Sequence, residues 1–172
     1  MIRAATAADA TAIALLHAAS WRSAYRGALP DAYLDGPIEA ERLAVWTRQL
    51  TTLAAGDTVL VATGAAGLDG FAAAFARPDG DALLDNLHVA PPLRGKGLGR
   101  QLLIEVARRL LSAGSRAMHL WVFDVNGDAR RFYERHGALA TARRREPMFG
   151  AEVPETRLAW PELAPLAAQA AR

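Results

Sequence analysis

The feature that most constrains the fold is a strand, a glycine-rich turn and a helix that follow one another between residues 82 and 111. Residues 82–89 are an apolar-rich extended stretch, and apolar side chains recur at helical spacing over residues 98–111. Glycines between them let the backbone approach a ligand closely, and a helix N-terminus attracts anions through unpaired N–H groups and its dipole. The sequence therefore predicts a phosphate-binding turn formed by Arg94, Gly95, Lys96, Gly97, Leu98, Gly99 and Arg100.

Two common phosphate-binding motifs do not fit this spacing. A P-loop places Ser or Thr directly after Gly-Lys, whereas here Gly97 follows Lys96 and no hydroxyl residue comes next. In the dinucleotide fingerprint the third glycine comes one residue later, and that motif lies near the first strand of a chain. Residues 89–99 read Val-Ala-Pro-Pro-Leu-Arg-Gly-Lys-Gly-Leu-Gly. This run resembles the coenzyme A pyrophosphate loop of the GNAT superfamily of N-acetyltransferases.

A second motif follows at residues 116–137. Residues 116–123 alternate and are rich in β-formers, which predicts a strand. Asn126 is a suitable N-cap for the next helix, and Gly137 is suited to end it. The pattern Asn-x-x-Ala-x-x-Phe-Tyr-x-x-x-Gly is similar to the second signature of the same superfamily. That resemblance implies four cofactor-facing residues: Asn126, Ala129, Phe132 and Tyr133.

The resemblance covers residues 1 to about 160 and implies an α/β (α+β) fold. Its central sheet is mixed, mostly antiparallel and splayed at the cofactor strand, with helices on both faces. We expect residues 1–160 to form a single domain and the Pro- and Ala-rich tail at residues 161–172 to be frayed.

The resemblance also implies an activity. The expected reaction is transfer of an acetyl group from acetyl-CoA to a primary amine of a small molecule or a peptide N-terminus. Because the chain contains no cysteine, we expect direct attack in a ternary complex rather than an acyl-enzyme. The alternative is a non-catalytic acyl-CoA-binding or sensing domain.

The family further implies roles around the reacting thioester. A bulge in the strand before the phosphate turn frees backbone groups for the cofactor. On this resemblance the Leu87 N–H would contact the acetyl carbonyl, Val89 would pair with the pantetheine arm, and His88 lies between them on the same cofactor strand. The Tyr133 hydroxyl would act as the general acid toward the sulfur.

The general base is less determined. Many relatives carry Glu at the position of Leu83. Strand alternation puts Leu83, Asp85 and Leu87 on one face and His88 on the other. Asp85 is therefore the first candidate, His88 is the second, and water or a more distant residue is the third.

The acceptor site is expected beside the first helix. In the family the first two helices and the last strands line it, which makes Trp21, Tyr25 and Arg26 the candidates. The alternative interpretation is an aromatic contact that fixes the helix end. Aromatic and arginine side chains would suit a carboxylate-bearing small molecule, and a peptide N-terminus fits equally well.

Composition excludes several classes of function. The 172 residues carry a net charge of only +2, and Glu146 follows the one dense basic run at residues 143–145, so nucleic-acid binding is not expected. The four histidines are scattered without ligand spacing, so we predict no metal site. No run of eighteen apolar residues exists, so we expect a cytoplasmic protein without a membrane span. A monomer and a homodimer are both left open.

The remaining elements are predicted from local patterns. Thr6 and Asp9 give a capping-box-like start to a helix over residues 8–20, and a second helix is expected over residues 37–53. The predicted strands are residues 2–4, 58–62, 71–75, 138–145 and 155–160, with a hairpin turn at residues 67–70.

Overall fold

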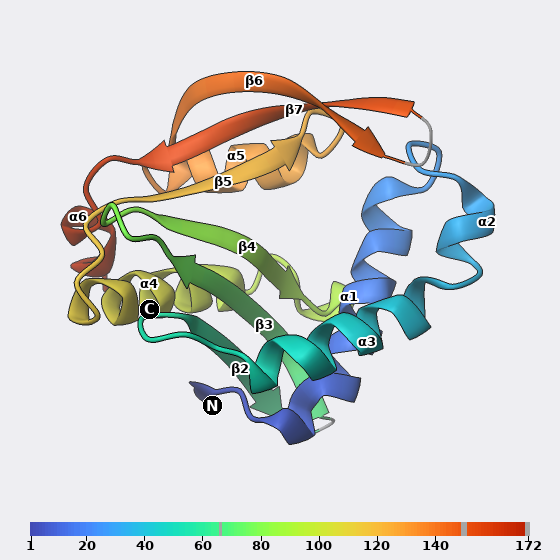
Figure 1. The fold of residues 1–172 in the computed structure, drawn as a ribbon, viewed down its shortest axis with the longest axis horizontal. Coiled ribbons are helices and arrows are strands. Elements are labelled where there is room, and N and C mark those ends of the chain that lie inside the picture. The colour runs from blue at the N-terminus through green and yellow to red at the C-terminus, as the bar shows by residue number, and fades with distance from the viewer. Residues whose placement is uncertain (66, 149–150, 171–172) are drawn as a thin grey trace.

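In a computed structural model that describes residues 1–65, 67–148 and 151–170, the chain folds around a seven-stranded sheet (Figure 1). The strand order is β1-β2-β3-β4-β5-β7-β6, and neighbouring strands are antiparallel except for β4 and β5. The strands span β1 Ile2–Ala4, β2 Thr58–Gly64, β3 Gly67–Ala76, β4 Ala82–Val89, β5 Met118–Phe123, β6 Leu139–Met148 and β7 Ala151–Trp160.

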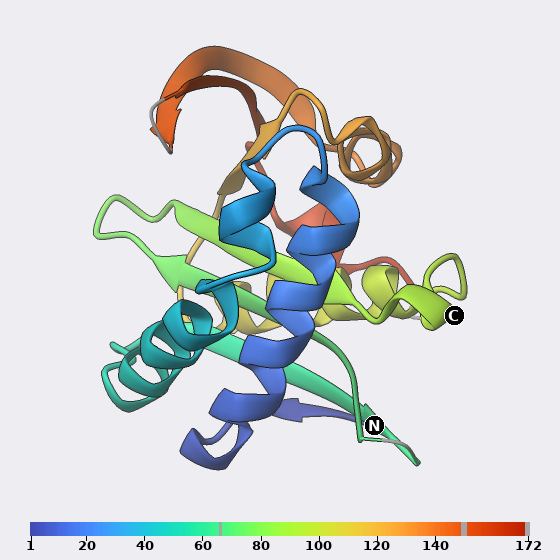
Figure 2. The ribbon, with the colours of Figure 1, turned by 90° about the vertical axis from the view of Figure 1, so that its right-hand side faces the viewer.

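Helices cover both faces of the sheet, as Figure 2 shows. On one face α1 (Ala10–Tyr25) and α3 (Ile38–Thr51) pack over β2 and β3, with the short α2 (Asp31–Leu34) between them. On the other face α4 (Leu98–Ser112) and α5 (Gly127–Arg135) enclose the larger core. The predicted fold, a mixed and mostly antiparallel sheet with helices on both faces, is confirmed. None of the helices in the described ranges is both long and apolar enough to span a membrane.

Local sequence patterns explain the main elements. In α4 the predicted apolar face is buried, and Leu102, Leu103, Val106 and Leu110 are all inaccessible to solvent. At the start of the chain the Asp9 carboxylate accepts hydrogen bonds from the Thr6 N–H and hydroxyl, at 2.8 and 3.0 Å. These contacts confirm that the two predicted residues meet at a helix start, which here is a short 3₁₀ turn that leads into α1.

Three expected boundaries were wrong. The expected turn at residues 67–70 lies inside β3, because Gly64 pairs with Gly67 and the hairpin therefore reverses earlier. Strands β6 and β7 are longer than expected, and β7 includes Pro154 opposite Arg145. Alternation of apolar side chains does not reveal these extensions, because the described β6 residues are mostly exposed.

The segment after Pro161 was expected to be frayed, and this was wrong for the residues described up to 170. It forms α6 (Ala164–Ala167), and Leu163 and Leu166 are 0 and 2% exposed in the core beside α4. The Leu163 N–H also donates a hydrogen bond of 2.8 Å to the Arg116 carbonyl. Two leucines three residues apart lie on one side of a helical turn, and this pair is enough to anchor an otherwise Pro- and Ala-rich segment.

We expect Leu163→Ala to lower the free energy of unfolding by about 2–5 kcal/mol, because it removes a fully buried side chain and leaves a cavity. Leu139→Ala is the matched control, since Leu139 is 57% exposed and its loss should change stability by less than about 0.5 kcal/mol. Urea denaturation of both variants measures the difference. Equal midpoints would mean that the C-terminal segment does not belong to the cooperative core.

Candidate active site

Strands β4 and β5 are neighbours in the sheet but barely pair. They run parallel and share a single paired position, Leu83 opposite His119, at the start of β4. Beyond this pair the two strands diverge (Figure 1). Within the described part of the chain, the second half of β4 therefore has one edge that is not paired with another strand. Buried backbone groups at such an edge require other partners.

A β-bulge at Asp85 changes which side chains share a face. Ala74 lies opposite Leu84 and Ala73 lies opposite Asn86, so Asp85 has no partner in β3. The expectation that Asp85 and Leu87 share a face is wrong, because the inserted residue shifts the alternation. Leu87 packs against the core beside α4.

Asp85 instead lies on the side of the sheet covered by α1 and α3. Its carboxylate accepts a hydrogen bond from the Asn86 amide, and the charges that act on it come from Arg42 of α3 and Arg77. Although Asp85 is exposed, desolvation by the protein around it raises the pKa of its carboxyl, and the hydrogen bond from Asn86 opposes the rise. His88 is on the same side, where its ring meets His17 and Phe71.

The backbone of β4 directs hydrogen-bonding groups toward the unpaired edge. In an antiparallel pair, alternate residues point their N–H and C=O groups at the partner strand. The Ala90 N–H donates to the Asp69 carbonyl in β3, at 2.8 Å. By alternation the backbone groups of Leu87 and Val89 point the other way, toward β5. The Arg94 Nε donates to the Val89 carbonyl there, at 3.2 Å.

The predicted phosphate-binding turn lies at the end of this edge. Gly97 is the N-cap of α4 with φ +87°, and Gly95 has φ +76°, both in the left-handed region that favours glycine. Within the described residues, none accepts a hydrogen bond from the backbone N–H groups of residues 95–100. Six consecutive free N–H groups at a helix start fit an anionic group such as a phosphate.

The three cations around the turn differ in their contacts. Lys96 is exposed. The Arg94 guanidinium crosses to α1, where it donates to the Ser23 hydroxyl at 3.2 Å. Arg100 donates to the Ala170 carbonyl and, at 3.5 Å, to the Gln169 side chain. The structure therefore brings Arg94 to the β4 edge and Arg100 to the C-terminal segment.

Helix α5 places its predicted residues next to the same turn. Asn126 caps the helix, as predicted, because its Oδ1 accepts from the Ala129 N–H at 3.2 Å. A Cβ on Gly99 would lie 3.6 Å from both the Phe132 ring and the Leu87 side chain, so these three residues meet. Phe132 thus lies where α4, α5 and β4 converge.

Tyr133 lies deeper, with 8% exposure, and its ring packs edge-on against Trp160 with centroids 6.0 Å apart. Among the described residues its hydroxyl has no hydrogen-bond partner. Burial raises the pKa of Tyr133, and Tyr25 adds to the rise. The phenol is therefore protonated at neutral pH and has a proton to donate.

The structure brings together two of the three acceptor-site candidates, Trp21 and Tyr25, and places Arg26 apart from them. Tyr25 packs edge-on against Trp21 and against Phe123 of β5, with centroids 5.5 and 5.3 Å apart. The Tyr25 hydroxyl also accepts a hydrogen bond of 3.4 Å from Asn126. Arg26 does not join them, because its exposed guanidinium pairs with Asp31 and Asp35 at 3.1 and 2.7 Å.

The sequence did not predict that His17 packs against His88. This side chain is 2% exposed, and its Nδ1 accepts a hydrogen bond of 3.1 Å from the buried Trp46 indole. Its ring centroid lies 4.7 Å from that of His88 and 5.8 Å from that of Phe71, and the His88 and Phe71 centroids are 5.1 Å apart, so the three rings form one cluster. Desolvation lowers the pKa of His88 to about 3, with Arg94 adding to the shift. The only available signal was the position of His17 on the apolar face of the first helix.

Comparisons with known proteins identify the family and the fold. The model of the acetyltransferase (GNAT) family matches residues 18–138. PaiA N-acetyltransferase from Thermoplasma acidophilum, solved with coenzyme A, is 22% identical with a TM-score of 0.72, covering 91% of this chain and 96% of its own. YncA of Salmonella typhimurium, described as an acetyltransferase and solved with acetyl-CoA, is 23% identical with a TM-score of 0.70 over 95% and 93%.

A third similar structure is a ribosomal-protein-alanine N-acetyltransferase from Brucella melitensis. It is 21% identical with a TM-score of 0.68, covering 93% of this chain and 98% of its own. These structures share the fold. None of the curated proteins matches the sequence. Because the family model spans more than half of the chain, this protein belongs to the GNAT family of acetyltransferases.

Proposed function

We propose that this protein transfers the acetyl group of acetyl-CoA to a primary amine of a small molecule or a peptide N-terminus. One observation carries the proposal: the unpaired edge of β4 leads directly to six free N–H groups at the start of α4. An extended amide chain that ends in a diphosphate matches that arrangement along its length. Similar structures that contain coenzyme A or acetyl-CoA support the same choice of cosubstrate.

The residues of the turn and of β4 would hold the two ends of the cosubstrate. The N–H groups of residues 95–100 would bind the pyrophosphate, with Lys96 adding positive charge. Val89 would pair with the pantetheine arm as a strand would, once its carbonyl is released from Arg94. When bound, acetyl-CoA supplies an acetyl group activated as a thioester. The Leu87 N–H, directed at the same edge, would donate to the acetyl oxygen as negative charge develops there.

Tyr133 is the proposed acid. Its hydroxyl is protonated at neutral pH, because burial raises its pKa, and it has no partner in the described part of the chain. The thiolate that leaves during acetyl transfer needs a proton from a nearby donor. Asn126, at the start of the same helix, connects this region to Tyr25 on the acceptor side.

We propose Asp85 as the base because of the position that the bulge gives it, and not because of strand alternation. The bulge puts its carboxylate on the face covered by α1 and α3, where the charge of Arg42 acts on it and the Arg42 guanidinium also lies over the Trp21 ring. The raised pKa of Asp85 makes it a stronger proton acceptor than an ordinary carboxylate. His88 is less suitable, because its ring packs against both His17 and Phe71 and its pKa is lowered to about 3.

The proposed acceptor is an amine attached to an apolar or aromatic group. Trp21, Tyr25 and Phe123 form a continuous set of partly buried rings between α1 and β5. Such rings bind planar or apolar groups and also attract an ammonium ion before it loses its proton. With no cysteine in the chain, the amine would attack the thioester directly.

Release of free thiol from acetyl-CoA in the presence of a panel of amines and peptide N-termini tests the function. The proposal expects turnover with at least one amine of low polarity and none without an acceptor. Tight binding of acetyl-CoA with no thiol release for any acceptor would favour the alternative, a domain that binds or senses acyl-CoA without catalysis.

We expect Tyr133→Phe to fold and to bind acetyl-CoA like the parent, since the ring and its packing on Trp160 are kept. Turnover should fall by about 100-fold, the usual contribution of a positioned acid. Steady-state rates at saturating acetyl-CoA measure this loss. Acetylation at the parental rate would mean that Tyr133 is only a packing residue.

For Asp85→Asn we expect a reduced rate at neutral pH that partly recovers at high pH, where the amine arrives deprotonated. In the parent, kcat/KM should fall as pH drops through the raised pKa of Asp85, because protonation removes the base. The variant should lack this acidic limb. His88→Asn is the matched comparison and should keep it. A profile for Asp85→Asn that overlays the parent, with the acidic limb lost in His88→Asn, would assign the base to His88.

A further inference from the structure

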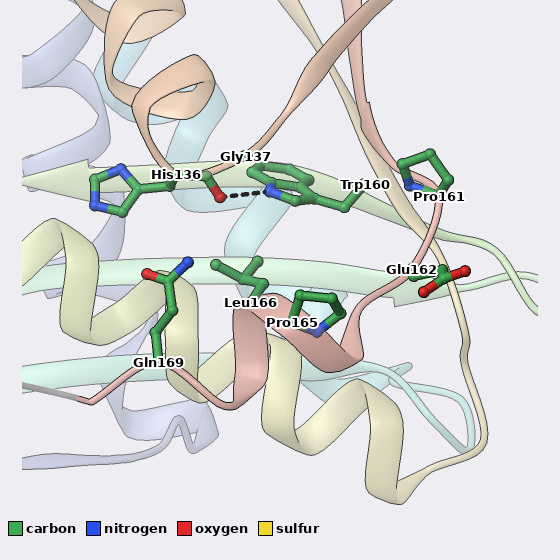
Figure 3. Close-up of a pocket in the computed structure, with 8 residues that line it drawn as sticks. All are labelled: His136, Gly137, Trp160, Pro161, Glu162, Pro165, Leu166 and Gln169. Carbon is green, nitrogen blue, oxygen red and sulfur yellow. Dashed lines mark hydrogen bonds between the residues drawn. The ribbon is translucent and has the colours of Figure 1, made fainter.

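Several polar groups around the cavity at the end of α5 already have partners within the protein. This cavity, of about 380 Å³, lies between the ends of α5 and β7 and the C-terminal segment (Figure 3). The Trp160 indole donates to the His136 carbonyl at 2.9 Å, and the His136 Nδ1 lies 2.7 Å from the Phe132 carbonyl. The Gln169 side chain accepts from Arg100. Buried polar atoms without a partner lie elsewhere, in the helices α1 and α3.

Three buried side-chain atoms have no hydrogen-bond partner within the described ranges. They are His17 Nε2 and Ser20 Oγ of α1 and Arg42 Nε of α3. Nearly all buried polar groups in proteins are hydrogen-bonded, so such exceptions call for an explanation. Trp21, next to Ser20 in the chain, connects them. Its ring centroid lies 5.4 Å from that of His17 and 5.3 Å from the guanidinium carbon of Arg42.

At least two of these three atoms are hydrogen-bond donors. The Trp46 indole can only donate, so the His17 Nδ1 accepts its bond of 3.1 Å and the His17 Nε2 carries the hydrogen. Burial lowers the pKa of His17 to about 2, and His88 and Arg42 add to the shift, so the ring is neutral at pH 7. The Arg42 Nε always donates. The region therefore offers donors, one of them on a cation, and this combination attracts an anion.

Arg42 also differs from the arginines at the end of α1 in having no ion pair. Arg22 pairs with Glu39, and Arg26 pairs with both Asp31 and Asp35. Arg42 contacts no carboxylate in the part of the chain that the structure describes. It is half-buried, and the group beside it is the uncharged Tyr33 hydroxyl. A half-buried guanidinium without a carboxylate in contact is suited to bind one from a ligand, because its planar fork matches the two oxygens.

We propose that Arg42 binds a carboxylate of the acceptor, so that the acceptor is a small amino acid whose amine and carboxylate lie close together. This inference rests on the proposed function, because it names the class of acceptor that the same site would use. Arg26, which the sequence favoured as the acceptor-side arginine, is already neutralised by its own ion pairs. The apolar part of the acceptor would contact the Trp21 ring, over which Arg42 lies.

The position of Arg42 relative to the proposed base agrees with such an acceptor. The charge of Arg42 acts on the Asp85 carboxylate, but the two side chains form no ion pair. They are therefore near one another without being in contact. An amino acid that places its carboxylate on Arg42 can direct its amine toward Asp85, since the two groups of the ligand are separated by a single carbon atom.

Three acceptors that share one aromatic group test the inference. L-phenylalanine carries the carboxylate, L-phenylalaninamide replaces it with an uncharged amide, as in a peptide N-terminus, and 2-phenylethylamine lacks it. Thiol release from acetyl-CoA gives kcat/KM for each, and the same comparison with L-leucine and L-methionine covers other apolar groups. We expect kcat/KM to be at least tenfold higher for the free acid than for the amide, about 1.4 kcal/mol, mainly through KM. Turnover of amines or amides without this preference would overturn the inference.

Variants then assign the preference to Arg42. Arg42→Gln should lose it, and comparing the ratio between proteins cancels the different basicity of the two amines. Arg42→Lys keeps the charge without the planar fork, so it should retain part of the preference, and it serves as the test if Arg42→Gln does not fold. Arg48→Gln, exposed on the same helix, is the matched control and should keep the parental ratio.

Two negative results have different meanings. The parental ratio in both Arg42 variants would mean that another residue binds the carboxylate, and would overturn the inference while leaving the proposed function intact. Absence of thiol release with every amine, with or without a carboxylate, would instead refute the proposed function itself.

Discussion

The structure depends on the single paired position between β4 and β5. Two neighbouring parallel strands that meet only at Leu83 and His119 leave the rest of β4 with backbone groups directed at an unpaired edge. Such groups are costly to bury without partners. Here they lead to the free N–H groups at the start of α4. The divergence that leaves this edge unpaired is therefore also what would let an extended ligand pair with β4 and place its phosphates at the helix start, as we propose.

The bulge at Asp85 determines which side chains of β4 lie on each face of the sheet. It shifts the alternation of β4, so that Leu87 packs toward α4 whereas Asp85 and His88 belong to the side of α1 and α3. We propose that the Leu87 N–H holds the acetyl oxygen and that the Asp85 carboxylate receives the proton. These two residues of one strand have side chains on opposite faces of the sheet. The ring contacts of His88 with His17 and Phe71 pack this part of β4 against α1 and β3.

Much of the fold and of the candidate site could be predicted from local sequence patterns. Glycine spacing located the turn at Gly97, side-chain chemistry identified Asn126 as a helix cap, and the amphipathic period located α4. The faces of β4 could not be predicted, because one inserted residue reverses the alternation and leaves no compositional mark. The packing of Leu163 was missed for a related reason: its partners are distant in the sequence, and local composition favoured a frayed end. Contacts such as Arg100 with Gln169 belong to the same class.

Hydrogen exchange of backbone amides with and without acetyl-CoA tests the central claim most directly. If β4 and the turn hold the cosubstrate, acetyl-CoA should slow exchange in peptides that cover Leu87, Val89 and residues 95–100. Peptides from the edge strand β6 should exchange at the same rate with and without the ligand. Slower exchange elsewhere with no change at Leu87 and the turn would contradict the account, because a bound cosubstrate would then leave these amides free.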